Sequence, residues 1–410
     1  MKAAYISSTQ CTRRSLDANK ISRYLIKNGY SITCNPKKAD VIILVTCSFR
    51  KEETVYWLKK ISYYSKFNSR LIVAGCLPAI DKKKLNNIFD GDVIITKDIN
   101  KINSLISEIN TPFELIDDSN IQYINLSTIE NKIKKLFCDL PLLNSIYIKL
   151  KTTILNNILH EKSFFKHLIT RYFYIRISWG CSGSCSYCAI KKAIGPYKSK
   201  PAELCLTELS NGLNFGFKNF YLTADDVGPY GLDINTSLPK LLEKMLSVSG
   251  NYSISIQHLS PQWIVKYIDD LEKILMKGKI NHILIPIQSA NKRILNLMCR
   301  YSDVDRFKDS LLRLKSTLPT LCINADFMIG FPTETWEEFY ETLKFIRDMK
   351  IEGGCIFPFS LKSDTKAEKL MPKISQKNIA KRLNYAKKFL KKNGKYIALK
   401  KSNSIIFSKK

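Results

Sequence analysis

Three cysteines lie within eight positions of the sequence, at Cys181, Cys185 and Cys188, and are called here the cluster-loop cysteines. Their spacing, Cys-x3-Cys-x2-Cys, lets three thiolates bind three irons of a cubane 4Fe–4S cluster while the fourth iron keeps no protein ligand. Such an open iron can chelate a cofactor or substrate. Zinc is the alternative, but it requires four ligands, and no histidine lies inside this segment.

Three further cysteines each follow one of the first apolar segments of the chain. Cys11, Cys47 and Cys76, the sheet-edge cysteines, end the stretches SSTQC, ILVTC and IVAGC. If these segments are parallel strands of one open sheet, their carboxyl ends share the edge at which ligands bind. The three thiols would then converge on one ligand, although a small buried cysteine near a strand is also a common packing residue.

Residues 1–112 alternate between apolar strands and amphipathic helices. KAAYIS, DVIILVT, RLIVAGC and DVIITKD have strand patterns, whereas SLDANKISRYLIKNGY and EETVYWLKKISYYSKF have helical ones. This alternation predicts an α/β fold whose amino-terminal domain is a doubly wound parallel sheet.

Residues 171–372 contain six strand candidates separated by helical stretches. The candidates are YFYIRIS, NFYLTA, YSISIQ, HILIPIQS, CINADFMIGFP and GGCIFPFS. Six βα units predict a partial, TIM-like (βα)6 barrel with its chemistry at the carboxyl ends of the strands. The cluster-loop cysteines follow the first of these strands and therefore lie on that side.

Two segments lack this pattern. Residues 113–170 predict a lysine-rich helical linker, and residues 373–410 predict a basic helical tail. Residues 361–410 carry 16 Lys and Arg against two acidic residues. A charge run is most often a solvated helix face, so the count alone indicates no function.

The composition favours a cytoplasmic protein that binds a polyanion. A formal net charge of +29 over 410 residues suits nucleic acid, although an AT-biased genome would also raise the lysine content. No apolar run of about 18 residues indicates a membrane span, and the start MKAAYISSTQ looks like a strand rather than a signal peptide. In the cytoplasm, twelve cysteines favour metal or redox chemistry over disulfides.

The motifs resemble those of the radical S-adenosylmethionine (SAM) methylthiotransferases. CSGSCSYCAIKKAIGPYKSKP is similar to the family's cluster loop, and VTCSFRKEE and VAGCLPAI are similar to its amino-terminal domain. IPIQSANKRILNLMCRYSDVDRF, DFMIGFPTETWEEF and FSLKSDTKAEKL resemble its later motifs, so the similarity covers about residues 2–372. LTADDVGPYGLDINTSLPKLL and CRYSDVDRF most resemble the branch that methylthiolates threonylcarbamoyladenosine beside a tRNA anticodon.

The resemblance implies two 4Fe–4S clusters and S-adenosyl-L-methionine as cofactors. The cluster on the cluster-loop cysteines would bind SAM and yield a 5′-deoxyadenosyl radical that removes hydrogen from a substrate carbon. The auxiliary cluster on the sheet-edge cysteines would carry a methylated sulfur for transfer to that carbon, so both open irons are expected to face one cavity. The implied partners are tRNA and a reductant such as flavodoxin or ferredoxin. The protein itself is expected to be a monomer.

The same resemblance supplies further candidate residues. Arg300 matches a basic residue of the family and is the candidate catalytic residue, although it also suits an ordinary surface position. Asp225 and Asp226 match an acidic or amide pair near the cofactor, or they cap a turn. The cofactor-binding candidates are Tyr187, Asp225, Asp226, Gln288, Ser289, Gly330 and Pro332.

Departures from the family affect the predicted substrate. Family members usually end in a small β-barrel that binds tRNA, whereas the residues after Ser360 predict helix and basic tail, which is a candidate phosphate-binding arm. Lys362 and Asp364 stand where the family has Arg and Gly.

Two alternatives to tRNA methylthiolation therefore stay open. One is the same chemistry on a protein or peptide, and the other is a two-cluster electron-transfer protein, which has no use for open irons. The remaining cysteines match no motif and are predicted to be packing or surface residues: Cys34, Cys138, Cys205, Cys299, Cys322 and Cys355.

Overall fold

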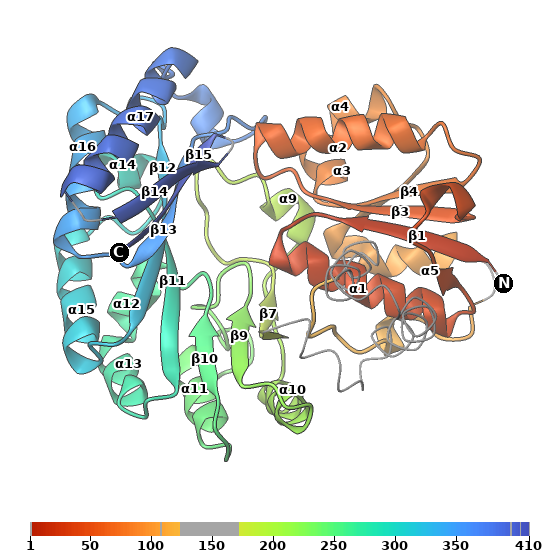
Figure 1. The fold of residues 1–410 in the computed structure, drawn as a ribbon, viewed down its shortest axis with the longest axis horizontal. Coiled ribbons are helices and arrows are strands. Elements are labelled where there is room, and N and C mark those ends of the chain that lie inside the picture. Colours follow the sequence, from red (N-terminus) through yellow and green to blue (C-terminus); the bar gives the residue numbers. More distant parts are fainter. Residues whose placement is uncertain (1, 107–108, 124–171, 394–395, 402, 410) are drawn as a thin grey trace, which may run out of the picture. The chain divides into compact units, whose positions relative to one another are not determined.

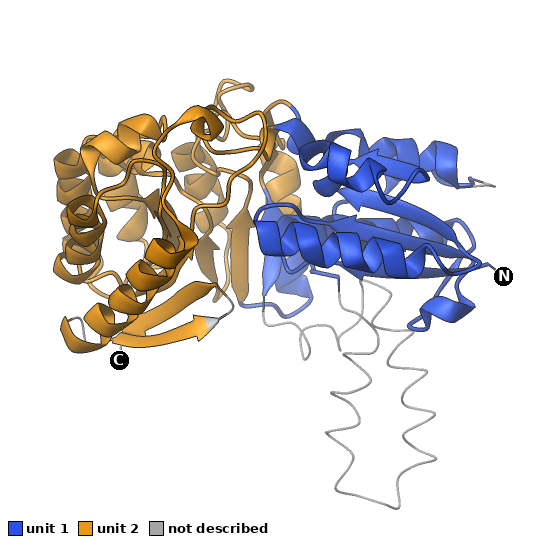
Figure 2. Ribbon diagram, turned by 90° about the horizontal axis from the view of Figure 1, so that it is seen from above, with its two compact units in different colours: residues 1–176, 192–195, 210–218 blue, residues 177–191, 196–209, 219–410 orange. Residues whose placement is uncertain are grey.

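The computed structural model describes residues 2–106, 109–123, 172–393, 396–401 and 403–409, which form two compact units (Figures 1 and 2). The first unit comprises residues 1–176, 192–195 and 210–218, and the second comprises residues 177–191, 196–209 and 219–410. Among the described residues, no helix has the length and apolarity needed to cross a membrane.

The first unit is built on a parallel sheet with helices on both faces. The strand order is β2 (Ser31–Ile32), β1 (Ala3–Ser8), β3 (Val41–Thr46), β4 (Arg70–Gly75) and β5 (Asp92–Ile95). The helices are α1 (Thr12–Lys27), α2 (Lys51–Tyr64), α3 (Leu77–Ile80), α4 (Lys82–Asn86) and α5 (Ile102–Leu105), with short η1 (Pro36–Lys38), η2 (Thr96–Lys101) and η3 (Phe113–Leu115). This arrangement confirms the predicted doubly wound sheet.

The two faces of β3 explain why its sequence is apolar throughout. Ile43 belongs to the core that contains Ile21 of α1, whereas the next residue, Leu44, belongs to the core that contains Trp57 of α2. Because alternate residues of a strand point to opposite faces, a central parallel strand covered on both sides must be apolar at every position.

Part of the predicted 113–170 linker lies against the first unit. Residues 113–123 begin with η3 and continue beside α1, where the Asn19 amide donates hydrogen bonds to Ser119 Oγ (2.7 Å) and to the Ile121 carbonyl oxygen (2.8 Å). Residues 124–170, with Cys138, lie outside the described residues. Strand β6 (Phe173–Arg176) follows, and its Arg176 pairs with Asp17 of α1 (2.7 Å).

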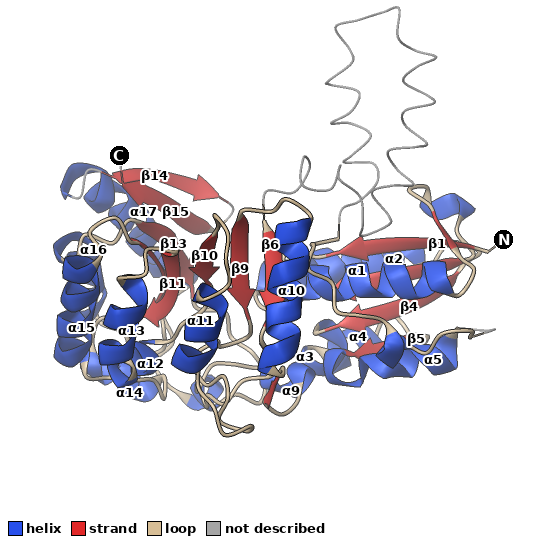
Figure 3. Ribbon diagram, turned by 90° about the horizontal axis from the view of Figure 1, so that it is seen from below, coloured by secondary structure: helices blue, strands red, loops and turns tan. Residues whose placement is uncertain are grey.

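The second unit is a curved sheet with helices on its outer side (Figures 1 and 3). Its parallel strands are β9 (Asn219–Thr223), β10 (Ser253–Ile256), β11 (Ile280–Gln288), β12 (Cys322–Ile329) and β13 (Gly353–Pro358). The helices are α9 (Lys191–Ile194), α10 (Ala202–Asn214), α11 (Leu238–Leu246), α12 (Pro261–Lys266), α13 (Ile268–Leu275), α14 (Lys292–Leu297), α15 (Val304–Thr317), α16 (Trp336–Asp348) and α17 (Gln376–Asn393), with short η5 (Lys366–Lys369); α9 and α10 each run into the first unit. A short ribbon pairs β7 (Ser178–Trp179) with β8 (Lys198–Ser199). All six strand candidates of the barrel segment are strands, which confirms the partial barrel.

The predicted helical tail is wrong over its last residues. Helix α17 is present, but it is followed by β14 (Tyr396–Lys401) and β15 (Ser404–Lys409), an antiparallel pair. β15 pairs with β13, so the carboxyl-terminal segment extends the barrel sheet. Alternate residues such as Ile405 and Phe407 are buried, and their burial stabilises a strand. The lysine content of this segment had suggested a solvated tail instead.

Candidate cluster-binding sites

The sheet-edge cysteines follow three neighbouring strands of the first unit. Cys11 caps α1 after β1, Cys47 directly follows β3, and Cys76 caps α3 directly after β4. In the sheet order, β1, β3 and β4 are adjacent. The topology therefore brings the three cysteines to one edge, as their positions in the sequence predict.

The strand ends beside Cys47 and Cys76 approach unusually closely. Thr46 pairs with Gly75, so the two cysteines are the next residues on neighbouring strands. Gly75 has φ +105°, and a Cβ placed there would lie 2.3 Å from the Thr46 carbonyl oxygen. Glycine is needed here both for the left-handed backbone and for the close approach.

The electrostatics indicate that the three thiols influence one another. Burial, and after it the negative charges of Cys11 and Cys76, raise the pKa of the Cys47 thiol to about 12. Three thiolates close together in a buried place are stable only beside a positive charge, which an iron cluster supplies. The donor set therefore fits an iron–sulfur group.

A buried carboxylate joins the two loops that carry Cys47 and Cys76. Asp81, just after α3, accepts hydrogen bonds from Ser48 Oγ and from Thr54 Oγ1 (2.9 Å), and it pairs with Lys84 (2.7 Å). Asp81, Ser48 and Thr54 are all buried. The network holds the loop after β3 against the loop after β4, which fixes the spacing of the two thiols.

The cluster-loop cysteines occupy a loop of the second unit. Gly180 begins it with φ +71°, and a Cβ there would lie 2.3 Å from the Pro196 carbonyl oxygen. Gly183 separates two of the thiols: a Cβ on it would lie 3.4 Å from Cys181 Sγ and 3.9 Å from Cys185 Sγ. The absence of a side chain at Gly183 leaves the space between the two sulfurs open, which fits a bound cluster.

Ser186 anchors the cluster loop, and the sequence analysis missed it. Its backbone N–H donates to the Met298 carbonyl oxygen (2.9 Å), and its hydroxyl donates to the Leu297 carbonyl oxygen (2.6 Å). Its own carbonyl oxygen accepts from the Ala367 N–H (2.9 Å). The loop is thus tied to the LMCR and SDTKA segments, two motifs that the sequence resemblance had already singled out.

Arg300 lies beside the cluster loop and is only partly exposed. Its Nη1 lies 3.4 Å from Cys185 Sγ, and its Nη2 donates to the Pro286 carbonyl oxygen at 2.5 Å. Burial disfavours the charged guanidinium, but Tyr187 and Cys185 outweigh this effect and raise the pKa of Arg300. Burial likewise raises the pKa of the neighbouring Tyr187. A fixed positive charge thus lies against one cluster-loop sulfur.

The two aspartates after β9 lie near the same loop. Burial, and after it the Asp226 and Asp225 carboxylates, raise the pKa of the Cys181 thiol to about 12. Asp226 also accepts from the Gly228 N–H (3.2 Å) and from Trp263 Nε1 (3.2 Å). Asp226 therefore holds α12 to the loop after β9, as the turn-capping alternative proposed.

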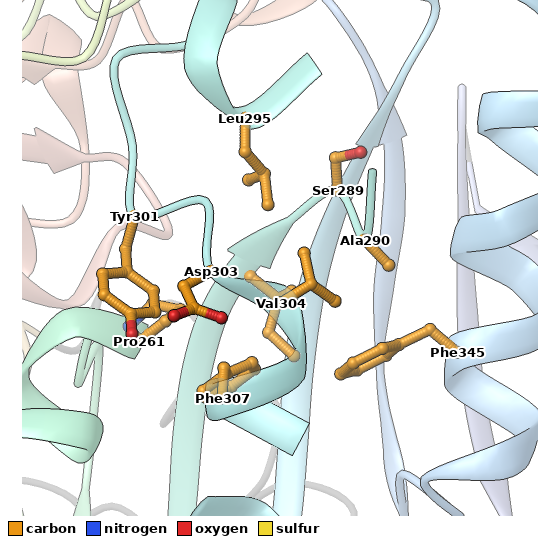
Figure 4. Close-up of a pocket in the computed structure, with 10 residues that line it drawn as sticks. Pro261, Ser289, Ala290, Leu295, Tyr301, Asp303, Val304, Phe307 and Phe345 are labelled. Carbon is orange, nitrogen blue, oxygen red and sulfur yellow. The ribbon is translucent and has the colours of Figure 1, made fainter. Parts of the chain in front are cut away.

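Gln288 and Ser289 do not share one environment, although they are adjacent. Gln288 ends β11 with φ +73°, is buried, and its Oε1 has no hydrogen-bond partner among the described residues. Ser289 lies behind the sheet, 3.4 Å from Thr342 Oγ1, and lines a cavity of about 10 Å³ with Leu295 (Figure 4). The structure therefore places Ser289 beside residues of α14 and α16.

The turn after β12 contains the last two candidates, Gly330 and Pro332. Gly330 has φ +72°, and a Cβ there would lie 2.7 Å from Ile379 of α17. The Gly330 N–H donates to the Glu334 carboxylate (2.7 Å), which also pairs with the buried Arg382 of α17. Helix α17 therefore fixes the shape of this turn.

A second arginine holds the same turn from α14. Arg293 pairs with Glu338 through two bonds of 2.6 and 2.7 Å and donates to the Thr333 carbonyl oxygen at 2.9 Å. Thr333 also donates its N–H to the Pro372 carbonyl oxygen (2.9 Å). The turn is a rigid feature, as a backbone contact to a cofactor requires.

The remaining cysteines vary in exposure. Cys205 is buried, Cys322 and Cys355 are partly buried, and Cys34 and Cys299 are exposed. Among the described residues, no three Cys, His, Asp or Glu side chains are set as ligands of a single metal ion.

Comparisons with known proteins agree with this geometry. Residues 175–346 match the profile of the radical SAM superfamily, and residues 3–96 match uncharacterized protein family UPF0004. The ribosomal protein uS12 methylthiotransferase RimO of Carboxydothermus hydrogenoformans is 28% identical over 381 residues, which cover 91% of this chain and 78% of that protein. A probable threonylcarbamoyladenosine tRNA methylthiotransferase of Methanocaldococcus jannaschii is 28% identical over 368 residues, covering 89% and 78%.

Among solved structures, the radical SAM methyltransferase TsrM of Kitasatospora setae has a similar fold, with a TM-score of 0.60 and 10% identity over 90% of this chain and 77% of that one. The fold and the cluster loop define a radical SAM enzyme. Within that class, the amino-terminal domain matches UPF0004, and the relatives that align over most of this chain are methylthiotransferases. Together, the two profiles and these relatives support a place for this chain in the radical SAM methylthiotransferase family.

Proposed function

We propose that this protein inserts a methylthio group into an unactivated C–H bond of threonylcarbamoyladenosine beside the anticodon of a tRNA. The observation that carries the chemistry is the pair of three-cysteine groups, each at the carboxyl ends of parallel strands. Two groups of three thiols leave two open irons, one for SAM and one for the transferred sulfur.

When bound, two 4Fe–4S clusters and SAM supply radical chemistry that replaces a C–H bond by a C–S bond. Cys181, Cys185 and Cys188 would hold the cluster that binds SAM, and Cys11, Cys47 and Cys76 would hold the auxiliary cluster. A flavodoxin- or ferredoxin-type reductant would supply the electron for reductive cleavage of one SAM, and a second SAM would supply the methyl group. The auxiliary cluster would supply the sulfur and accept the electron released when the C–S bond forms.

The chain's own residues position these groups. Ser186 holds the cluster loop, Arg300 places a positive charge against Cys185, and Asp81 fixes the spacing of Cys47 and Cys76. Glu334 fixes the shape of the turn at Gly330 by accepting its N–H.

The proposed tRNA substrate is supported by the charge of α17. Its exposed lysines form a stripe at helical spacing, comprising Lys377, Lys381, Lys388 and Lys391. Lysines spaced along one face neutralise phosphates and make binding strongly dependent on salt. The similarity to a probable threonylcarbamoyladenosine tRNA methylthiotransferase of Methanocaldococcus jannaschii supports the same substrate.

A protein substrate is the second candidate. RimO of Carboxydothermus hydrogenoformans, named for ribosomal protein uS12, has the same 28% identity as the tRNA relative. The carboxyl-terminal residues described here form helix α17 and the β14–β15 hairpin.

One experiment separates the candidates. Nucleosides from bulk tRNA and tryptic peptides of ribosomal proteins are compared by mass spectrometry in strains with and without the gene. Loss of a methylthio-adenosine supports the first candidate, and loss of a methylthio-peptide supports the second. If both pools are unchanged and reconstituted protein forms no 5′-deoxyadenosine, the proposed function is wrong.

A further inference from the structure

The parallel strands of the second unit separate apolar from polar side chains. Toward the helices they place fully buried residues, such as Leu222, Ile256, Ile285 and Phe327. Because neighbouring residues of a strand point to opposite faces, the alternate positions belong to the concave side of the sheet. Near the carboxyl ends of β9, β10, β11 and β12 these alternate residues are Thr223, Gln257, Gln288 and Asp326.

Three of these side chains lack the partners that burial demands. Thr223 Oγ1, Gln257 Oε1 and Gln288 Oε1 are buried and have no hydrogen-bond partner among the described residues. Leaving a buried polar atom unpaired costs about 1–3 kcal/mol, so such atoms are rare in folded proteins. Three of them on three consecutive strands indicate a surface prepared for a polar ligand.

Asp326 is the only charged member of this row. No described residue donates a hydrogen bond to it or forms an ion pair with it, in contrast to the bonded Asp226. The side chain is partly exposed, yet burial alone raises its pKa to about 6. Solvent or a bound group can therefore reach the Asp326 carboxylate.

The strand register places Asp326 below the cluster loop. Asp326 pairs with Cys355 of β13, and two residues further along β12 Met328 pairs with Phe357. Met328 and Phe357 belong to an apolar cluster against which Tyr187 of the cluster loop packs. Asp326 is therefore the first polar group beneath that apolar layer on the same side of the sheet.

We propose that Asp326 is a specificity-determining residue that accepts a hydrogen bond from an N–H or O–H group of the molecule bound inside the barrel. The inference rests on the proposed function and adds a recognition residue to it. A carboxylate only accepts hydrogen bonds, so the ligand must present a donor. Two sources have the right chemistry: the ammonium and ribose hydroxyls of SAM, and the hydroxyl or amide N–H groups of the substrate.

The test compares Asp326→Asn with Asp305→Asn in the reconstituted holoenzyme. Both variants lose one carboxylate, but Asp305 lies on α15 with a side chain that is 90% exposed. The dissociation constant of SAM is measured by equilibrium dialysis, which needs no turnover, and methylthio product and 5′-deoxyadenosine are counted in parallel. Iron content and the circular dichroism spectrum check that each variant is folded and loaded.

Loss of a charge-assisted hydrogen bond predicts a change of about 10- to 100-fold in one parameter. If the donor belongs to SAM, its dissociation constant rises by that factor in Asp326→Asn. If the donor belongs to the substrate, SAM binding is unchanged, while the KM of the substrate or the ratio of 5′-deoxyadenosine to methylthio product rises. Values within twofold of the Asp305→Asn control in every measurement overturn the inference. Absence of 5′-deoxyadenosine from the wild-type enzyme instead contradicts the proposed function.

Discussion

Replacement of Arg382 by Met is expected to destabilise the barrel unit and to loosen the turn at Gly330. Arg382 and Glu334 form a buried pair, with side chains 6% and 1% exposed, and Arg382 also donates to the Glu334 carbonyl oxygen (2.8 Å). Removing one partner of a buried pair costs about 3–5 kcal/mol, because the other charge is left without compensation.

The pH dependence of this loss follows from the position of Glu334. Burial raises the pKa of the Glu334 carboxyl, whereas Arg382 and the Gly330 N–H lower it. In Arg382→Met the pKa of Glu334 rises further, because the neighbouring positive charge is gone. Near neutral pH the Glu334 carboxyl therefore takes up a proton, and the loss of stability stays near about 3 kcal/mol. A folded-state pKa above the unfolded one means that stability falls as pH rises through this range, so the variant loses more stability at pH 8.5 than at pH 6.

Thermal unfolding measures the effect. For a unit of this size 1 kcal/mol corresponds to about 2–4 °C, so a loss of about 3 kcal/mol lowers the midpoint by about 6–12 °C. Lys381→Met, at an exposed position of the same helix, is the control and should change little. The double variant Glu334→Gln with Arg382→Met should recover most of the loss, because no charge is then buried alone. Midpoints within about 2 °C of wild type at both pH values, or a double variant no more stable than Arg382→Met, would refute the reasoning.

Three other changes test the cluster sites and the basic helix. Replacing all three sheet-edge cysteines by Ala should lower the iron content of reconstituted protein from about eight to about four per chain; 5′-deoxyadenosine should still form while methylthio product is lost. Gly75→Ala should give the same loss of iron without removing a thiol, because its Cβ would lie 2.3 Å from the Thr46 carbonyl oxygen; full iron loading would contradict this. Charge reversal of Lys381 and Lys388 should lower the salt dependence of tRNA binding. The slope of the logarithm of the binding constant against the logarithm of salt concentration should be smaller by about 0.7–0.9 for each phosphate that the helix no longer neutralises. Filter binding across a salt series measures this slope, and an unchanged slope argues against an RNA-binding helix.

The sequence was sufficient to predict how the sheet-edge cysteines group, because the strand pattern alone determines their placement. Cys47 and Cys76 each end an apolar run, and parallel neighbouring strands necessarily bring such ends together. Their ligand role is still a prediction. For Ser289 the motif gave only a position after a strand and not the face on which its side chain lies, and the structure places its hydroxyl 3.4 Å from Thr342 Oγ1 of α16.

The carboxyl-terminal segment was misjudged because lysine content masked two patterns. In α17 the buried positions Ile379, Leu383, Ala386 and Leu390 form an apolar stripe, and Arg382 lies on that same face. The position of Arg382 could therefore have been predicted as buried, although its partner Glu334 could not. Removing residues 373–410 to test RNA binding would also remove this ion pair and β15, which is why charge reversal at exposed lysines is the better experiment.

The departures from the family motif leave the support of the cluster loop intact. Asp364 stands where the family has Gly, and its φ of +58° is the left-handed conformation that glycine favours and aspartate tolerates better than most residues. Lys362, in place of Arg, is buried, and its carbonyl oxygen accepts from Thr365 Oγ1 (2.8 Å). The turn still presents the Ala367 N–H to Ser186 of the cluster loop. Because these substitutions preserve the geometry around the cysteines, differences in substrate between this chain and its relatives are expected to arise from α17, the terminal hairpin and the concave row that ends at Asp326, rather than from the radical chemistry.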